Sequence, residues 1–353
     1  MWSVKKIPTR AEFHGYPIAT TVDSDSAKYY LENYLAGKNT DSQLQRRIEV
    51  LEQAKPETLP TRDDLKTISD DFSVDFAALH FVHRLLSQSG NPELQKQYLR
   101  NLKKIRSRTI KFPRADILIM LVPGYDYVEN GHITGADLKK PREIMEQSGY
   151  EVAFVDIDPI GSVEENAAYL SQRIREQKHR KVAVAGASSA GPAIHLALGK
   201  LLSPQETKNV KAWLNLGGIL RGSPLLDKFS TGPKGWLFST IIWFKGWKRY
   251  SFESMYAELS RKRFETLSVS RHIQIYNYLG LSLSGDISKY GRDKYSMMMD
   301  DGPNDGLTLL PDIIAPNSLS ILSPTTDNFF AQDPDIDKKT LALVVTILKR
   351  INR

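Results

Sequence analysis

The sequence predicts an α/β protein with a mostly parallel central sheet flanked by helices. From about residue 110 onward, short apolar segments alternate with segments that have helical spacing. The segment 115–122 is nearly unbroken in its apolar character and lies between Pro113 and Pro123, as expected for a strand covered on both faces. A turn of small residues at 186–191 then joins a buried strand to a helix. Regular alternation of this kind is what right-handed crossovers between parallel strands require.

The elements of this sheet follow one another along the second part of the chain. Strands are predicted at 115–122, 150–157, 182–185, 211–216, 273–281 and 318–323, with helices at 164–177 and 193–202. We assign this region, 111–353, to a single domain.

Residues 1–110 differ from the rest because they are charge-rich and carry helical spacing. Helices are expected at 26–35, 42–54, 62–71, 74–87 and 92–105, separated by Pro56, Pro60 and the turn at Gly90. We interpret this segment as a helical cap or docking segment, joined to the second domain by a basic link.

The turn at 186–191 is the most informative stretch of the chain. It reads Gly-Ala-Ser-Ser-Ala-Gly, and small neighbours of this kind let the backbone bend sharply enough to present Ser188. A phosphate-binding or purely structural turn is the alternative. A dinucleotide fingerprint fits poorly, because Ser188 replaces its middle glycine and a complete strand-helix unit precedes this one.

At this motif the chain resembles the α/β-hydrolase superfamily, in particular its lipase- and esterase-like members, over roughly residues 110 to 350. The resemblance implies an α/β-hydrolase fold with Ser188 as the nucleophile. Ala190 stands where the family's elbow usually has glycine. Ser189 is an alternative nucleophile, but Gly186, two residues before Ser188, favours Ser188 because conformational freedom is needed there.

The resemblance also implies the partners of Ser188. The backbone N–H groups of Tyr125, after the first strand, and of Ser189 would form the oxyanion hole. The loop Asn-Asp-Gly-Leu at 304–307 is similar to the one that carries the acidic triad member in many lipases, which makes Asp305 the acid.

The expected catalytic histidine is absent from its place. The loop after the last strand carries Asn328 where the family has histidine, and no histidine follows His272. An asparagine amide cannot accept the Ser188 proton near neutral pH, and loss of one triad member can remove roughly 10⁶ in turnover. Three interpretations stay open: His132 replaces the base, the protein is a pseudoenzyme that binds a ligand, or Asn328 is a change particular to this chain.

The other histidines do not suggest a metal or cofactor. His80 and His83 have helical spacing, but the apolar residues around them favour a half-buried helix face. We expect His195 to pack against the sheet. With no cysteine in the chain, we expect neither disulfides nor thiol catalysis. With no cysteine and no His-Glu-x-x-His motif, we expect no metal site, and no cofactor is expected either.

Residues 221–270 occupy the usual place of a lid, between the fourth strand and the acidic loop. This segment contains aromatic side chains beside lysines and arginines, which would suit an interfacial helix or a cover over an acyl pocket. The aromatic residues are Trp236, Phe238, Trp243 and Phe244. Contact with a membrane surface through these aromatic residues is therefore one expectation, and a lid packed over the core is the other.

Composition bounds the remaining functions. The 353 residues are 41% hydrophobic and carry a net charge of +7. No apolar run of about eighteen residues and no signal peptide is visible, so a soluble, cytoplasmic protein is expected. No nucleic-acid-binding motif accompanies the positive charge, and no nucleic-acid partner is expected.

These observations predict hydrolysis of small-molecule acyl esters through an acyl-enzyme on Ser188. The rival is a non-catalytic binding protein with the same fold, favoured by Asn328. A third interpretation is a basic adaptor whose N-terminal helices bind a partner. The sequence does not specify the acyl length or the oligomeric state.

Overall fold

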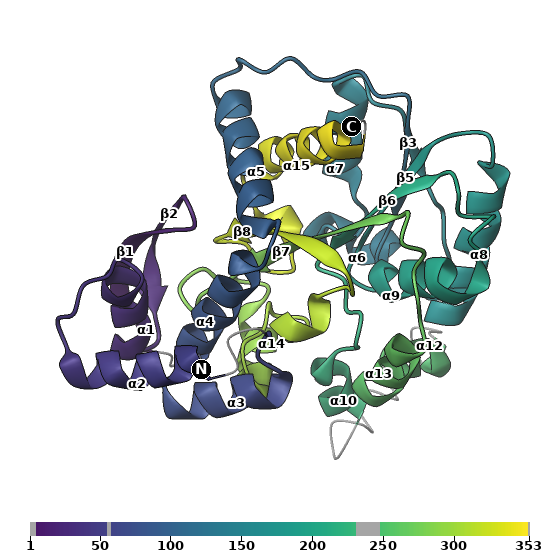
Figure 1. The fold of residues 1–353 in the computed structure, drawn as a ribbon. Helices are drawn as coiled ribbons and strands as arrows, with labels where there is room; N and C mark the ends of the chain where they lie inside the picture. The colour runs from purple at the N-terminus through teal and green to yellow at the C-terminus, as the bar shows by residue number, and fades with distance from the viewer. Residues whose placement is uncertain (1–4, 55–57, 231–247, 352–353) are drawn as a thin grey trace.

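A computed structural model describes residues 5–54, 58–230 and 248–351 (Figure 1). Its centre is a six-stranded sheet in the order β4-β3-β5-β6-β7-β8, and every neighbouring pair is parallel. The strands are β3 (Leu118–Val122), β4 (Val152–Phe154), β5 (Val182–Ala187), β6 (Val210–Leu216), β7 (Gln274–Leu281) and β8 (Ser318–Pro324). The predicted α/β class is confirmed, and all six predicted strands are present with shifted ends.

Both faces of the sheet are covered, which explains the continuous apolar strands. Side chains alternate along β5: Val182 and Val184 belong to the core on one face, whereas Ala183, Ala185 and Ala187 belong to the core on the other. The first face packs against α8 (Val163–Glu176) and α9 (Ala190–Leu196), and the second against α5 (Asn91–Arg106), α7 (Lys139–Gln147) and α15 (Ile336–Ile351).

Local signals in the sequence fix several helix starts. Ser162 and Glu165 form a capping box at α8, in which each side chain accepts a hydrogen bond from the other residue's backbone N–H. Thr61 and Asp64 do the same at α3 (Arg62–Asp71). Such boxes satisfy N–H groups that have no partner within the helix.

The N-terminal segment is helical where predicted, but it also contains a hairpin that the sequence analysis missed. The helices are α1 (Asp25–Tyr29), which continues as a π-helical turn to Tyr34, α2 (Ser42–Gln53), α3, α4 (Val74–Ser87) and α5. Strands β1 (Ile7–Phe13) and β2 (Tyr16–Val22) pair antiparallel across a two-residue turn. His14 and Gly15 both have positive φ in this turn, 49° and 81°, as the tight hairpin turn requires. The description of residues 1–110 as a helical segment therefore omits the two strands between residues 7 and 22.

The N-terminal segment shares its core with the sheet. Phe76 and Phe81 of α4 lie in one apolar cluster with Leu279 and Leu281 of β7 and Leu322 of β8. Helix α5 runs beside α15 over the sheet (Figure 1). A domain boundary at residue 110 stays a prediction, but deletion of residues 1–110 would open this shared core.

The insertion between β6 and β7 lies on the side of the sheet that carries the predicted site. It contains α10 (Pro224–Ser230), α12 (Arg249–Glu253) and α13 (Ala257–Glu265), and α14 (Arg292–Met298) follows β7 (Figure 1). The predicted lid residues Trp236, Phe238, Trp243 and Phe244 lie outside the described residues. Over the described ranges, no helix combines the length and apolar character needed to cross a bilayer.

Candidate active site

Ser188 lies at the sharp turn from β5 into α9. Its φ is 54°, a left-handed conformation that is uncommon for residues other than glycine and is often found at functional sites. The Ser188 carbonyl accepts hydrogen bonds from the N–H groups of Gly191 and Ile219, both at 3.1 Å. These bonds hold the turn in place. The residue with the strained backbone is also the one predicted to be the nucleophile.

The glycines around Ser188 provide space rather than backbone freedom. The φ of Gly186 is not positive, contrary to the reason for which we favoured it. A Cβ atom at Gly186 would collide with Ile194 Cδ1 and lie 3.0 Å from the Cβ of Ala190. A Cβ atom at Gly191 would lie 2.8 Å from Gly218 Cα. The strand and helix therefore pack too closely for side chains at these two positions.

Asp305 is buried and fully engaged by hydrogen bonds. Its Oδ1 accepts from the backbone N–H groups of Leu307 and Thr308, both at 2.9 Å. Its Oδ2 accepts from the Asn328 side-chain amide at 2.6 Å. Burial raises the pKa of Asp305 to about 6, and the hydrogen bonds from Asn328, Thr308 and Leu307 oppose that rise. The carboxylate is thus mostly ionised at neutral pH.

Asn328 occupies the place predicted for the base. Its Nδ2 also donates to the carbonyl of Gly217 at 2.9 Å, and its backbone N–H donates to the carbonyl of Asp305 at 2.9 Å. The neighbouring Asp327 accepts from the N–H groups of Phe329 and Ser288, each at 2.9 Å. The acid orients Asn328 as it would orient a histidine, but the amide has no basic nitrogen.

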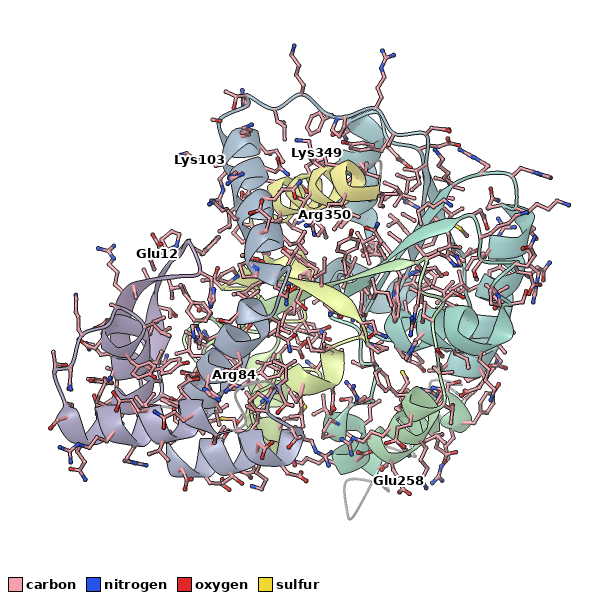
Figure 2. All side chains as sticks on the ribbon, viewed as in Figure 1. Glu12, Arg84, Lys103, Glu258, Lys349 and Arg350 are labelled. Carbon is pink, nitrogen blue, oxygen red and sulfur yellow. The ribbon has the colours of Figure 1, made fainter. Side chains whose placement is uncertain are left out.

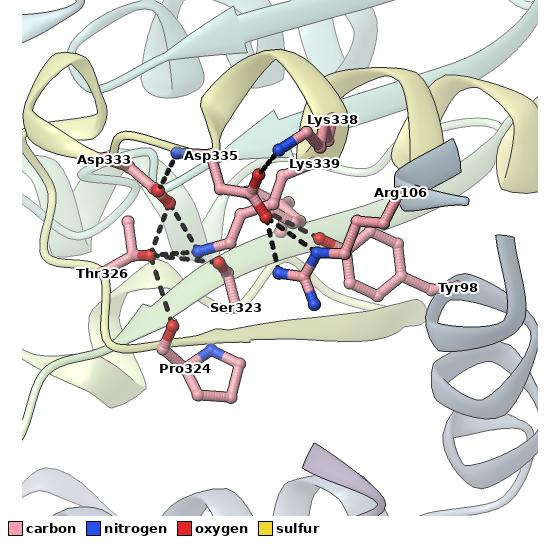
Figure 3. A network of polar contacts seen from close by, with 10 residues as sticks. Tyr98, Arg106, Ser323, Pro324, Thr326, Asp333, Asp335, Lys338 and Lys339 are labelled. Atoms are coloured by element: carbon pink, nitrogen blue, oxygen red, sulfur yellow. Dashed lines mark hydrogen bonds and ion pairs between the residues drawn. The ribbon is translucent and has the colours of Figure 1, made fainter. Parts of the chain in front are cut away.

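A buried polar network fixes the loop that carries Asn328 (Figure 3). The ammonium of Lys339 on α15 donates to Asp333 at 2.5 Å and to Thr326 at 2.9 Å. Thr326 in turn donates to Asp333 at 2.9 Å. Next to this group, Arg106 of α5 pairs with Asp335. Two helices therefore hold both ends of the loop around Asn328.

The two predicted oxyanion donors meet beside Ser188, but one already has an acceptor. The N–H of Tyr125 donates to the hydroxyl oxygen of Ser189 at 2.6 Å. Ser189 directly precedes α9. For the Tyr125 N–H to act as an oxyanion donor, the Ser189 hydroxyl would have to rotate away from it.

One cavity of about 200 Å³ brings most of the predicted site together. Tyr125, Ser188, Ser189 and Asn328 line it, and Asp305 lies behind Asn328. Sequence reasoning did not identify the rest of the wall, which is mainly apolar. It includes Leu226, Phe252, Met255, Tyr290, Lys294, Leu307, Phe329 and Phe330. Leu226, Phe252 and Met255 come from the predicted lid insertion.

Lys294 on α14 is the only ammonium group among the described residues that line this cavity. Its Nζ donates to the carbonyl of Tyr290 at 3.0 Å and lies 3.6 Å from the centre of that ring. Burial lowers the pKa of Lys294. No motif marks this lysine in the sequence, because its approach to Ser188 depends on how α14 packs.

The structure does not bring His132 to Ser188. His132 is exposed on α6 (Tyr127–Thr134) and lines a different cavity, and within the described chain no histidine lines the Ser188 cavity. His195 stacks on Trp213, with ring centres 5.4 Å apart, as the predicted packing against the sheet requires. His80 bonds to Glu52 at 3.0 Å. The described residues contain no cluster of three potential metal ligands.

Comparisons with known proteins agree with this arrangement at the level of the fold. No protein-family profile matches the sequence, and no curated protein matches it either. Among solved structures, a metagenomic carboxyl esterase superposes with a TM-score of 0.55 at 17% identity, covering 69% of this chain and 77% of the esterase. The mature lipase BlEst2 of Bacillus licheniformis superposes with a TM-score of 0.50 at 21% identity, covering 67% of this chain and 93% of the lipase. The chain therefore has the α/β-hydrolase fold.

Proposed function

We propose that this protein is a serine hydrolase-like protein that cleaves small acyl esters through Ser188, at a rate limited by the missing base. One observation carries the proposal: the strained Ser188 shares a cavity with Asn328, and the buried Asp305 accepts a hydrogen bond from the Asn328 amide. These contacts support Ser188 as the nucleophile and Asp305 as the acid, with Asn328 at the place of the base.

The proposed reaction has two steps. In the first, Ser188 Oγ bonds to the ester carbonyl carbon, its proton passes to water, and the C–O bond to the alcohol breaks. The alcohol leaves with a proton from solvent. In the second, water attacks the acyl-enzyme, which releases the carboxylic acid and restores the serine. The N–H groups of Tyr125 and Ser189 stabilise the oxyanion in both steps after the Ser189 hydroxyl has rotated away.

The cavity favours small, apolar acyl groups. Its volume of about 200 Å³ lies below the range of roughly 300–1,000 Å³ typical of drug-sized ligands. Phe252 and Met255 from the insertion cover it, and the Tyr125 and Phe252 rings lie 5.0 Å apart. Short-chain esters are therefore the proposed substrates.

A second candidate function is ligand binding without turnover. Asn328 favours it directly, because its Nδ2 is held by both Asp305 and Gly217 and its amide cannot accept the serine proton. In that case the same cavity would hold an ester or acid without cleaving it. In triad knockouts, oxyanion stabilisation alone leaves a rate roughly 10³ to 10⁴ times that of the reaction in water. A rate enhancement of this size that depends on Ser188 would indicate the hydrolase, and its absence would indicate ligand binding without turnover.

The test is the initial rate on p-nitrophenyl acetate and butyrate for the natural chain and for Ser188→Ala. Turnover that Ser188→Ala abolishes, together with Ser188-dependent labelling by a fluorophosphonate, supports the hydrolase. Ser189→Ala is the matched control for the neighbouring hydroxyl, and it should retain labelling. Equal rates for the natural chain and Ser188→Ala, with no labelling, would refute the hydrolase and favour binding.

A further inference from the structure

A second and larger cavity lies on the other face of the sheet. It measures about 370 Å³ and lies between β3, β5 and β6 on one side and α7 and α15 on the other. This volume falls within the range of roughly 300–1,000 Å³ for small-molecule sites. Hydrophobic side chains form most of its wall, including Leu214 of β6 and Leu343 and Val344 of α15.

The sequence of β5 explains why this space is open. Every β5 side chain that faces it is an alanine, at positions 183, 185 and 187, whereas the opposite face of the strand carries Val182 and Val184. Helices α7 and α15 pack against each other beyond the alanines, so the short side chains leave a channel between sheet and helices. The phenol of Tyr278 in its wall is already bonded to Tyr98 at 3.3 Å. The interior thus suits a hydrocarbon.

The edge of this cavity is polar and contains cations. Lys139 and Lys140, at the start of α7, line it and are exposed, and neither has a carboxylate within 4.0 Å in the described part of the chain. Asp137 and Glu143 also line this edge, and an Asp137 oxygen accepts from the backbone N–H of Lys139 at 3.2 Å, but neither carboxylate pairs with the two ammonium groups within 4.0 Å in the described part of the chain. A ligand with an anionic head group would supply the partner that the two ammonium groups lack.

The cavity ends against the candidate active site. Gly135, Ala187 and Phe330 line both this cavity and the Ser188 cavity, and Ala187 directly precedes Ser188. Figure 2 draws the described side chains on the whole ribbon. The two spaces are therefore neighbours that share a wall, but they have different linings.

We infer that the cavity between the sheet and α7 and α15 binds a fatty carboxylate. Its alkyl chain lies along Ala183, Ala185 and Ala187, and its head group lies at Lys139 and Lys140. This site is independent of the proposed hydrolysis, because binding requires no reaction at Ser188.

Binding is measured by the fluorescence of cis-parinaric acid, a polyene fatty acid, and by its displacement from the purified full chain. We expect saturable binding. Displacement should strengthen roughly fourfold for each CH₂ added from octanoate to dodecanoate, and then level off when the cavity is full. Dodecanoate should displace the probe better than dodecanol. The inference is overturned if binding is not saturable or if chain length has no effect.

Two variants that fill the cavity locate the bound chain. Ala185→Leu on β5 and Thr340→Phe on α15 should each weaken binding at least tenfold, and the melting temperature of each shows whether it is folded. If Ala185→Leu does not fold, Thr340→Phe gives the result alone. Met255→Trp, which fills the Ser188 cavity instead, is the matched control and should leave binding unchanged. Loss of binding in Met255→Trp but not in the other two would overturn the inference.

Charge variants test the head group. The double variant Lys139→Gln, Lys140→Gln should weaken dodecanoate but not dodecanol, whereas Lys178→Gln, at an exposed lysine between α8 and β5, should change neither. Equal affinity for acid and alcohol in the natural chain would refute the anionic head group.

Discussion

Asn328 donates a hydrogen bond from Nδ2 to Oδ2 of Asp305 at 2.6 Å. This is the relationship by which a triad acid orients its base, with an amide in place of the imidazole. The same Nδ2 donates to the Gly217 carbonyl, so Asn328 is held by two acceptors. Under the proposed function, this is the position at which a base would be held beside Asp305.

Asn328→His should restore general-base catalysis. An imidazole at this position would donate to Asp305 and present its second nitrogen toward the Ser188 cavity, which is worth typically 10²–10⁴ in rate. We expect a gain of that size in kcat on p-nitrophenyl butyrate. The gain should disappear below the pKa of the new histidine, because a protonated imidazole cannot accept the Ser188 proton.

The control for this gain is Ser188→Ala in the Asn328→His background, which should lower the rate to that of Ser188→Ala alone. Asn328→Gln provides an amide of similar size to histidine without a basic nitrogen. A folded Asn328→His variant with no increase in rate would show that the loop does not place residue 328 within reach of Ser188.

Ser188→Gly should be more stable than Ser188→Ala. Both lack the hydroxyl, but the φ of 54° costs roughly 1–2 kcal/mol for a residue with a Cβ and little for glycine. Glycine also gains freedom in the unfolded chain, which offsets part of this difference. We expect the free energy of unfolding in urea to be about 1 kcal/mol higher for Ser188→Gly. A more stable Ser188→Ala would contradict strain at this residue.

Gly186 and Ala190 should be coupled. A Cβ at Gly186 would lie 3.0 Å from the Cβ of Ala190, so Gly186→Ala should destabilise the fold by about 1–3 kcal/mol through overpacking. Ala190→Gly removes one of the two atoms in the way, and the double variant should recover part of the loss. A double-mutant cycle measured by urea unfolding gives the coupling energy. Simple additivity would mean that Ile194, the other obstacle, accounts for the whole cost.

The sequence predicted the parts of this protein that depend on local pattern. Buried parallel strands appear as apolar runs, and the elbow at Ser188 appears as a cluster of small residues between a strand and a helix. The position of Asp305 and the asparagine at 328 followed from resemblance to the fold, and the structure brings both together.

The β1–β2 hairpin is a local feature that the sequence analysis overlooked, because exposed and buried residues alternate along both strands as expected for a half-buried hairpin. The other features that the sequence did not predict depend on distant contacts. Lys294 enters the Ser188 cavity only through the packing of α14, and the Ser189 hydroxyl reaches Tyr125 across 64 residues of sequence. The sequence analysis singled out Gly186 for its backbone freedom. Glycine is required there instead because helix α9 packs too closely for a Cβ atom.

Asp305 should make stability depend on pH in a defined direction. Burial raises its pKa from 3.8 to about 6, so between these values the folded protein binds more protons than the unfolded chain. The contribution of Asp305 to the free energy of unfolding is therefore largest below about pH 4, falls as pH rises toward 6, and is constant above. At about 1.4 kcal/mol per pH unit, the fall is on the order of 3 kcal/mol.

Asp305→Asn removes this titration. The free energy of unfolding of the natural chain minus that of the variant therefore isolates the contribution of Asp305 from those of Asp327 and the other carboxyl groups. Urea unfolding of both proteins from pH 4 to 7 should show the difference decreasing up to pH 6 and then remaining level. A difference that is level from pH 5 to 7 and decreases only below about pH 5 would mean that the hydrogen bonds from Asn328, Leu307 and Thr308 outweigh burial and hold the pKa below 3.8. Above pH 6 Asp305 is ionised, and this is the state that stabilises an imidazolium in Asn328→His. The pH dependence of stability and the activity of Asn328→His should therefore both depend on the ionisation of Asp305.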